Sequence, residues 1–343
     1  MKKPLFSIII PTRQINDFLL LENLPALNRQ TWRNFEVIVL PNNLPLDYST
    51  LLTCYPWLKI IPTGKISRPA EKRDIGVEKA TGEIIVFIDD DAYPEKNWLK
   101  NATYLFKTKR FSVLCGPGIL PAAANFWERV FDQILVSWIG SGNYCYRFIP
   151  MKERFVDDYP SMNFFIKKQV FKKLGGFNSD YWPGEDSKLC EDLVYKRKEK
   201  ILYSPKLVVY HHRRNNLIAY LKQHANYGFH RGAFFAHGDR NSRRVSYLIP
   251  TLFIFYLFFF LLFIIYYLLF RIGFLTSYFL ILAFPLLIYS ILNFLLIIQS
   301  FVNTKKIIVS LVVFPVLFLT HLTYGIIFVK GFFVGKVKKN IYE

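Results

Sequence analysis

Three consecutive aspartates, Asp89, Asp90 and Asp91, follow the apolar run Ile84–Ile88. Adjacent carboxylates repel one another, so this arrangement costs stability unless a cation lies among them. Because side chains alternate along an extended chain, Asp89 and Asp91 can point the same way and share one ion. Oxygen ligands of this kind suit Mg²⁺ or Mn²⁺ held together with substrate phosphates. An acidic turn that starts the next helix is the structural alternative, but a strand end in a basic region favours the metal site.

A second acidic pair, Glu185 and Asp186, follows Gly184 and begins a helix predicted to run to Arg197. A positioned carboxylate can take the proton from a hydroxyl group as that group attacks. A helix N-terminus favours the ionised carboxylate that this role needs. Acids are equally ordinary in a first helical turn, so these two residues alone leave both interpretations open. The nearby Trp182 is open in the same way, since it could stack on a sugar ring or pack in the core.

Histidines and arginines form two later groups, one at His211–Arg214 and one around Arg231. Such side chains together can bind a metal or a diphosphate. No second histidine follows four residues after His211 or His212, so a zinc site is not expected. We therefore take His211 and Arg231 as candidate contacts of an acceptor or a phosphate.

The elements that must position these residues alternate along residues 5–110. Predicted strands are Leu5–Ile10, Phe35–Leu40, Leu58–Ile61 and Ile84–Ile88, and predicted helices between them are Ile15–Gln30, Tyr48–Tyr55 and Pro69–Ala80. This alternation predicts an α/β fold, with a parallel sheet covered by helices on both faces. Ligands bind at the carboxyl ends of such strands, which here are residues 11–13, 41–43 and 89–91.

Five segments resemble the family 2 glycosyltransferases in order and spacing, over about residues 5–235. They are Ser7–Thr12, Arg73–Gly76, Gly82–Asp91, Gly175–Phe177 and Trp182–Cys190. The resemblance implies a Rossmann-like nucleotide-diphospho-sugar transferase domain with a mostly parallel sheet. It also implies a divalent metal, Mn²⁺ or Mg²⁺, and sugar transfer with inversion at the anomeric carbon.

The resemblance also implies roles for single residues. Pro11-Thr12 resembles the first nucleotide-contacting loop, and Arg73 resembles the basic residue near the nucleotide and its phosphates. Asp91 resembles the principal metal ligand, while Asp89 resembles a ribose or metal contact and Asp90 lies beside them at the nucleotide sugar.

At the acidic pair, the family pattern favours Asp186 as the catalytic base, with Glu185 second. One departure concerns the nucleotide, because this chain has Asn42 and Asn43 where the family usually has an acid that contacts the base. Asn42 can still hydrogen-bond a base. The segment around Arg231 resembles the family's late membrane-surface segment but lacks the Gln-x-x-Arg-Trp signature of processive synthases, which favours transfer of single sugars.

Charge and apolarity divide the 343-residue chain near residue 245. Residues 245–343 hold 7 of the 44 Lys and Arg and 1 of the 25 Asp and Glu, so the preceding part is strongly basic. A hydrophobic content of 52% excludes a disordered or fibrous protein. Four scattered cysteines exclude a disulfide-dense scaffold and a zinc ribbon. We predict a catalytic domain at residues 1–240 and a membrane domain at residues 245–335.

Three apolar runs without charge lie in the membrane domain: Tyr247–Phe270, Phe274–Ser300 and Ile307–Val329. The first two are long enough to span the hydrocarbon core. A third span would place the basic tail Lys336–Lys339 outside, against the positive-inside rule. The third run is therefore left open as a span or as a re-entrant or interfacial helix, which gives two or three transmembrane helices.

The side of the membrane is predicted from arginines that crowd the approach to the first span, Arg231, Arg240, Arg243 and Arg244. Such charges favour the cytosolic side and bind anionic lipids. The apolar stretch that stops at Pro11 is too short for an export signal. We expect an integral protein of the cytoplasmic membrane with a cytosolic catalytic domain.

The leading hypothesis is thus an inverting, metal-dependent glycosyltransferase. Its donor is a nucleotide-diphospho-sugar, and its acceptor is membrane-associated, such as a polyprenyl-linked saccharide or a glycan. Membrane lipids are expected partners, and nucleic acid is not. A nucleotidyltransferase is the alternative enzyme, but residues 11–14 lack the glycines of its phosphate loop. An inactive membrane-tethered scaffold is the other alternative, and the acids Asp89, Asp91 and Asp186 count against it.

Overall fold

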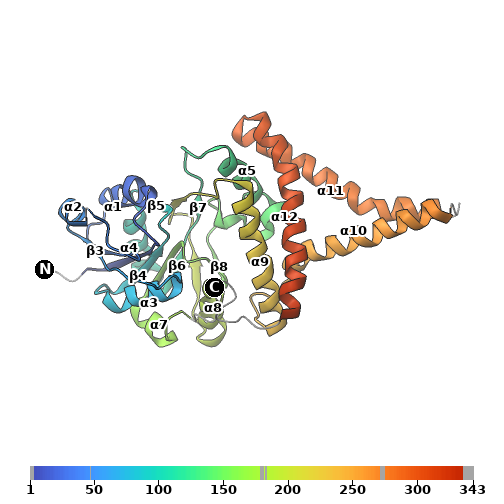
Figure 1. Ribbon diagram of the computed structural model, residues 1–343. Helices are drawn as coiled ribbons and strands as arrows, with labels where there is room; N and C mark the ends of the chain where they lie inside the picture. The colour runs from blue at the N-terminus through green and yellow to red at the C-terminus, as the bar shows by residue number, and fades with distance from the viewer. Residues whose placement is uncertain (1–3, 47, 178–180, 182–183, 271–274, 335–343) are drawn as a thin grey trace. The chain divides into compact units, whose positions relative to one another are not determined.

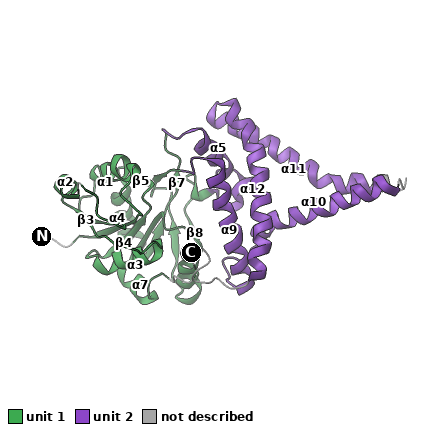
Figure 2. Ribbon diagram, viewed as in Figure 1, with its two compact units in different colours: residues 1–122, 146–212, 337–343 green, residues 123–145, 213–336 purple. Residues whose placement is uncertain are grey.

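The structure is a computed structural model that describes residues 4–46, 48–177, 181, 184–270 and 275–334 (Figure 1). The chain divides into two compact units (Figure 2). Within the described residues, unit 1 comprises 4–122 and 146–212, and unit 2 comprises 123–145 and 213–334. The predicted boundaries at residues 240 and 245 stay a prediction.

Unit 1 is built on an eight-stranded sheet with the strand order β3-β2-β1-β4-β9-β6-β10-β8. The strands are β1 (Phe6–Pro11), β2 (Phe35–Leu40), β3 (Leu58–Ile60), β4 (Ile84–Ile88), β6 (Val113–Cys115), β8 (Arg154–Val156), β9 (Asn163–Lys167) and β10 (Ile201–Tyr203). Parallel pairs join β1 to β2 and β4, β2 to β3, and β6 to β10. Strand β9 runs antiparallel to β4 and β6, and β8 runs antiparallel to β10. The sheet is therefore mostly parallel, as predicted.

A smaller sheet has the order β5-β11-β7, formed by β5 (Ala92–Pro94), β7 (Gly118–Ile119) and β11 (Val209–His211). Strands β5 and β11 pair antiparallel, and their register places His211 opposite Ala92. This pairing brings His211 next to the aspartates that follow β4, although more than a hundred residues separate them in the sequence.

The helical elements of unit 1 are η1 (Leu19–Asn23), α1 (Leu24–Asn28), α2 (Tyr48–Cys54), α3 (Pro69–Lys79), α4 (Trp98–Lys109), α7 (Lys168–Leu174), α8 (Glu185–Glu191) and η4 (Asp192–Lys196). The four predicted strands occur with ends shifted by at most one residue. The helix predicted over Ile15–Gln30 is shorter and covers residues 17–28, with a π-helical stretch at Leu19–Asn23. Asn16 Oδ1 accepts a hydrogen bond from the Leu19 amide and so caps its start.

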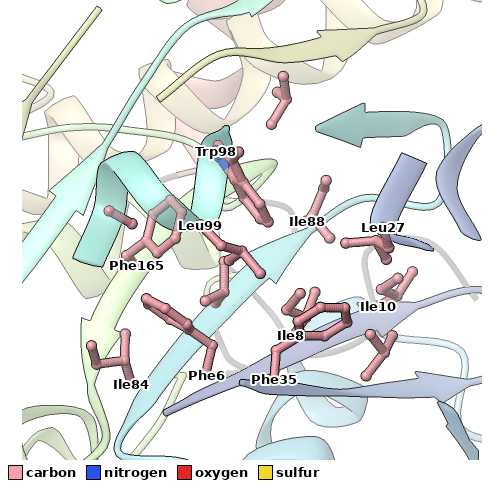
Figure 3. Close-up of a cluster of buried hydrophobic side chains, with 14 of the residues drawn as sticks. Phe6, Ile8, Ile10, Leu27, Phe35, Ile84, Ile88, Trp98, Leu99 and Phe165 are labelled. Atoms are coloured by element: carbon pink, nitrogen blue, oxygen red, sulfur yellow. The ribbon is translucent and has the colours of Figure 1, made fainter. Parts of the chain in front are cut away.

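Helices cover both faces of the large sheet, as predicted. On one face, Figure 3 shows side chains of β1 packed with those of α1 and α4, including Phe6, Ile8, Ile10, Leu27, Trp98 and Leu99. The alternate residue Ile9 points to the other face, where α3 passes close to the sheet. A Cβ added to Gly76 of α3 would lie 2.5 Å from Ile9 Cγ2, so glycine permits this approach. The close packing holds Lys72 and Arg73 of α3 at the strand ends.

Unit 2 is helical in its described residues. It contains α5 (Phe126–Leu135), α6 (Trp138–Ser141), α9 (Leu217–His237), α10 (Val245–Phe270), α11 (Leu275–Thr304) and α12 (Ile307–Val334), and the 3₁₀ segment η2 (Gly142–Arg147) runs across the boundary between the units. Helices α10 and α12 and residues Tyr278–Thr304 of α11 are long and apolar enough to cross a membrane. They coincide with the three predicted apolar runs and form a C-terminal membrane anchor.

Candidate active site

Asp89, Asp91 and His211 form a cluster that could hold a metal ion. One ligand atom from each lies within 4.8 Å of the others, and His211 Nε2 is 3.1 Å from Asp91 Oδ1. The other ring nitrogen of His211, Nδ1, is buried and has no hydrogen-bond partner among the described residues. Two carboxylates and one imidazole are a donor set that fits a divalent transition metal such as Mn²⁺. The sequence prediction that Asp89 and Asp91 share one face agrees with this arrangement.

Asp90 points the other way and fastens the loop that follows β1. Its Oδ2 accepts hydrogen bonds from Thr12 Oγ1 (2.5 Å) and Asn16 Nδ2 (2.8 Å). Burial raises the pKa of Asp90 to about 6, against the Thr12 hydrogen bond, and the charges of Asp91 and Asp89 raise it further. The alternation expected of an extended chain thus gives the three aspartates two different environments.

Arg73 of α3 lies between the aspartate cluster and the acids of α8. Its Nη2 is 2.8 Å from Asp89 Oδ1, and its Nη1 is 3.3 Å from Glu185 Oε1 and 3.9 Å from Asp186 Oδ1. The guanidinium also lies over the Phe177 ring, 5.6 Å from its centroid. Burial lowers the pKa of Arg73, but the charges of the three carboxylates outweigh burial and raise it above its usual value. Arg73 therefore stays charged and joins the two acidic groups.

The two acids of α8 differ in access to solvent. The Glu185 side chain is 8% exposed and the Asp186 side chain 27% exposed, so Asp186 is the more accessible of the two. Burial raises the pKa of both carboxyls, and for Glu185 the charge of Asp186 adds to this effect while Arg73 opposes it. The helix start was expected to keep these groups ionised. The structure adds an opposing desolvation effect that only tertiary packing creates.

Lys72 and Asp74, which the sequence analysis did not select, hold the parts of the site together. The buried Lys72 Nζ donates to the backbone oxygens of Thr12 and Leu40 and to Asn42 Oδ1, so it joins the ends of β1 and β2. Burial lowers the pKa of Lys72 to about 8. Asp74 Oδ1 accepts a hydrogen bond from the Phe177 amide at 3.0 Å. Both residues are adjacent to Arg73 in the sequence, and this proximity is the feature from which they could have been predicted.

The remaining candidates are distributed as follows. Pro11 ends β1 and is buried, next to Thr12. Arg231 belongs to unit 2, where its Nη1 donates to Ser242 Oγ and its guanidinium lies 4.5 Å from the centroid of the Tyr247 ring. Trp182 lies outside the described residues. The structure thus brings together Thr12, Asn42, Arg73, the three aspartates, the α8 acids and His211.

Parts of this chain are similar to known proteins. The family model described as glycosyl transferase family 2 matches residues 7–175. A pre-mycofactocin glycosyltransferase from Mycobacterium tuberculosis is 23% identical over 227 residues, which are 65% of this chain and 46% of that protein. A dolichyl N-acetyl-alpha-D-glucosaminyl phosphate 3-beta-D-2,3-diacetamido-2,3-dideoxy-beta-D-glucuronosyltransferase from Methanococcus voltae is 25% identical over 186 residues, 53% of this chain and 56% of that protein.

Among solved structures, a mannosyltransferase from Pyrobaculum calidifontis in complex with GDP-Man and Mn²⁺ is similar. The TM-score is 0.48 at 17% identity, with 67% of this chain and 62% of that chain covered. The chain spans about half the length of the two curated relatives named above.

Proposed function

The chain belongs to glycosyl transferase family 2 through residues 7–175, and from this premise we propose that it transfers a single sugar from a nucleotide-diphospho-sugar to a membrane-associated acceptor, with inversion. In this proposal the catalytic region comprises residues 1–240 and the membrane domain residues 245–335. The observation that carries the proposal is the position of Arg73, within 4 Å of Asp89 on one side and of Glu185 and Asp186 on the other. One guanidinium thus joins a cation-binding cluster to a pair of acids.

Asp186 acts as the base. It takes the proton of the acceptor hydroxyl while that oxygen forms a bond to the anomeric carbon, and the bond from this carbon to the phosphate oxygen breaks. The nucleoside diphosphate leaves with the bonding electrons. Attack from the face opposite the leaving group inverts the anomeric carbon. Arg73 supports this step because its charge opposes the rise in the Asp186 pKa that burial causes.

Asp89, Asp91 and His211 hold the divalent cation, Mn²⁺ or Mg²⁺, with Asp91 as its principal ligand. A cation bound there would neutralise charge on the diphosphate of the donor and of the leaving group. The nucleoside contacts Asn42 and Thr12, with Pro11 beside Thr12. Asp90 holds Thr12 in place and Lys72 holds Asn42 in place, each through a hydrogen bond. In this assignment His211 is a metal ligand, and Arg231 and Trp182 remain candidate contacts of the acceptor.

A lipid-linked acceptor is proposed because the chain carries its own membrane anchor. The Methanococcus voltae relative is named for a dolichyl-linked sugar phosphate as its substrate, which supports the same class of acceptor here. The arginines that precede α10 support a catalytic domain on the cytosolic face of the cytoplasmic membrane.

The experiment is a panel of labelled nucleotide sugars added to membranes that contain the full-length protein, with Mn²⁺, Mg²⁺ or EDTA. We expect one donor to label a lipid-extractable or glycan product, to release a nucleoside diphosphate, and to stop doing so in EDTA. The anomeric configuration of the product, read by NMR, should be opposite to that of the donor. Release of pyrophosphate would indicate a nucleotidyltransferase, and no turnover with any donor or extract would indicate an inactive scaffold.

A further inference from the structure

Helices α9 and α12 of unit 2 pack unusually close to each other at glycines. A Cβ added to Gly228 would lie 2.5 Å from Tyr324 O, and one added to Gly232 would lie 2.1 Å from Phe328 O. On the opposite helix, a Cβ added to Gly331 would lie 2.0 Å from Phe229 O. Small residues that allow such backbone contact are typical of tightly associated helices.

The contact extends along most of α12, and the two helices run in the same direction. Near the start of both, Tyr220 of α9 belongs to one buried cluster with Val309, Val313 and Leu317 of α12. Near their ends, Gly232 meets Phe328. Consequently, any tilt or depth that α12 adopts in a membrane is shared by α9.

Helix α9 is too polar to cross the hydrocarbon layer. It carries Lys222, Gln223, Asn226 and Arg231 within ten residues, and it is not among the described helices that could span a membrane. Each lysine or arginine at the centre of a bilayer costs about 2.5–3.5 kcal/mol. If α12 crossed the membrane upright, its partner α9 would have to take these side chains with it.

Helices α10 and α11 behave differently, because each contacts α12 less extensively than α9 does. Gly325 of α12 lies so close to α10 that a Cβ there would be 2.6 Å from Pro250 O, and Thr251 Oγ1 donates to Gly325 O at 3.2 Å. From Thr251 the helix continues for 20 residues to Phe270, about 30 Å at 1.5 Å per residue. That length equals the thickness of the hydrocarbon core. On α11, the hydroxyl of Tyr289 lies 3.2 Å from His321 Nδ1 of α12.

The extent of burial also separates α10 and α11 from α12. Only 11% of the most apolar stretch is buried in α10 and in α11, against 33% in α12. Figure 2 shows α10 and α11 running away from α12 toward a common end. Apart from Lys330 near its end, the side chains of α12 that remain exposed are mainly apolar, among them Ile308, Leu311, Phe314, Ile326 and Phe333. One side of α12 is therefore covered by α9, and the other is suited to lipid.

We propose that only α10 and α11 cross the membrane and that α12 lies in the interfacial layer, with α9 on its aqueous side and acyl chains on the other. The surface that α9 and α12 form together docks on a bilayer containing anionic lipids. Arg240, Arg243 and Arg244, between α9 and α10, face the phosphates of that layer. The end of α12 then lies on the same side of the membrane as residues 1–244. This inference concerns the membrane domain and does not depend on the reaction.

The side of the membrane on which a residue lies can be determined by labelling single cysteines in sealed vesicles with an impermeant maleimide. The native Cys54 is exposed and marks the side of residues 1–244, whereas Cys115, Cys145 and Cys190 are buried. In a Cys54→Ser background, Lys330→Cys near the end of α12 is the test position, and Lys306→Cys before α12 is its matched control. Both lysines are exposed. Phe270→Cys marks the far end of α10.

We expect Lys306→Cys and Lys330→Cys to react from the same side as Cys54 and Phe270→Cys to react from the opposite side. Reaction of Lys330→Cys from the side of Phe270→Cys would overturn the proposal, since α12 would then cross. Reaction of Phe270→Cys from the Cys54 side would overturn it as well. If lipid shields Lys330→Cys from both sides, Glu343→Cys decides in the same way.

Discussion

The strand-end site of unit 1 and the α9–α12 helix pair of unit 2 are held together by opposite means. In the site, charged side chains from α3, α8, β11 and the residues after β4 fix one another, with Arg73 at their centre. In the helix pair, contact depends on side chains that are missing, at Gly228, Gly232 and Gly331. The site should therefore tolerate small changes of size but not of charge, and the helix pair should tolerate changes of charge but not of size.

The largest effect is expected where a charge is removed without a change of shape. Asp186→Asn keeps the size and hydrogen-bonding capacity of the side chain but removes its basicity, so kcat should fall by roughly 10²- to 10⁴-fold. The KM for the donor should stay the same, because the interaction matters only in the transition state. Steady-state kinetics with the natural acceptor measure both values.

Asp192→Asn is the matched control for that variant. Asp192 lies six residues further along, pairs with Lys188 and Lys196, and is not among the carboxylates around Arg73. Its replacement should change kcat by less than about threefold, because the two ion pairs that it breaks do not involve Arg73 and such pairs contribute little. Equal losses in the two variants would mean that Asp186 only supports the helix, and near-normal turnover in Asp186→Asn would move the base to Glu185.

Removal of a metal ligand should weaken binding instead of turnover alone. Asp91→Ala is expected to lower the affinity for a nucleoside diphosphate in the presence of Mn²⁺ by at least about 100-fold, since even residues that merely support metal ligands are worth 10- to 100-fold. The fold should persist, because one of three adjacent carboxylates is lost and their repulsion falls. Calorimetry with Mn²⁺ present and absent tests the affinity, and an unchanged value would remove Asp91 from the metal site.

In the helix pair, size should matter most. Gly232→Leu places a side chain where a Cβ would already lie 2.1 Å from Phe328 O and 2.8 Å from Phe332 N. Overpacking of this kind costs about 1–3 kcal/mol, so the thermal midpoint of the detergent-solubilised protein should fall. Lys222→Gln, which removes the charge of an exposed residue on the same helix, should leave the midpoint unchanged. A midpoint that falls in Lys222→Gln but not in Gly232→Leu would reverse the comparison.

Asp74 combines both kinds of constraint, and its effect on stability should be confined to a narrow pH range. Its carboxyl contacts the Gly175–Phe177 loop, and burial raises its pKa from the usual 3.8 to about 6. The folded state therefore binds this proton more tightly than the unfolded state. The contribution of this protonated carboxyl to the free energy of unfolding is fully present below about pH 4 and is lost as the pH rises to about 6.

Asp74→Asn cannot titrate, so its stability relative to the native chain should improve between pH 4 and 6 and stay constant above that range. The change is bounded by about 1.4 kcal/mol per pKa unit. Thermal midpoints of the two proteins across this pH range measure it. A constant difference between them would mean that the Asp74 carboxyl titrates near its ordinary pKa.

Much of the fold could be predicted from local patterns. Continuous apolar runs such as Ile84–Ile88 are what a strand buried on both faces requires, and that strand occurs with the same ends. Runs of more than twenty uncharged, mostly apolar residues identify helices that are long enough to cross a membrane. The three aspartates were informative for a similar reason, because adjacent charges and strand alternation are properties of neighbouring residues.

The sequence by itself thus determined the order of the elements, the acids that end β4 and begin α8, and the apolar character of the last hundred residues. Only the tertiary structure decided which of these meet. His211 joins Asp89 and Asp91 because β11 pairs with β5. A second histidine four residues away is a local pattern, and such a pattern cannot reveal a ligand that comes from another strand. The balance between burial and Arg73 at Glu185 and Asp186 likewise depends on which elements cover them. The close contact of the polar helix α9 with the apolar helix α12 was also decided at this level, because contact between distant segments depends on how whole surfaces fit and not on the composition of either one.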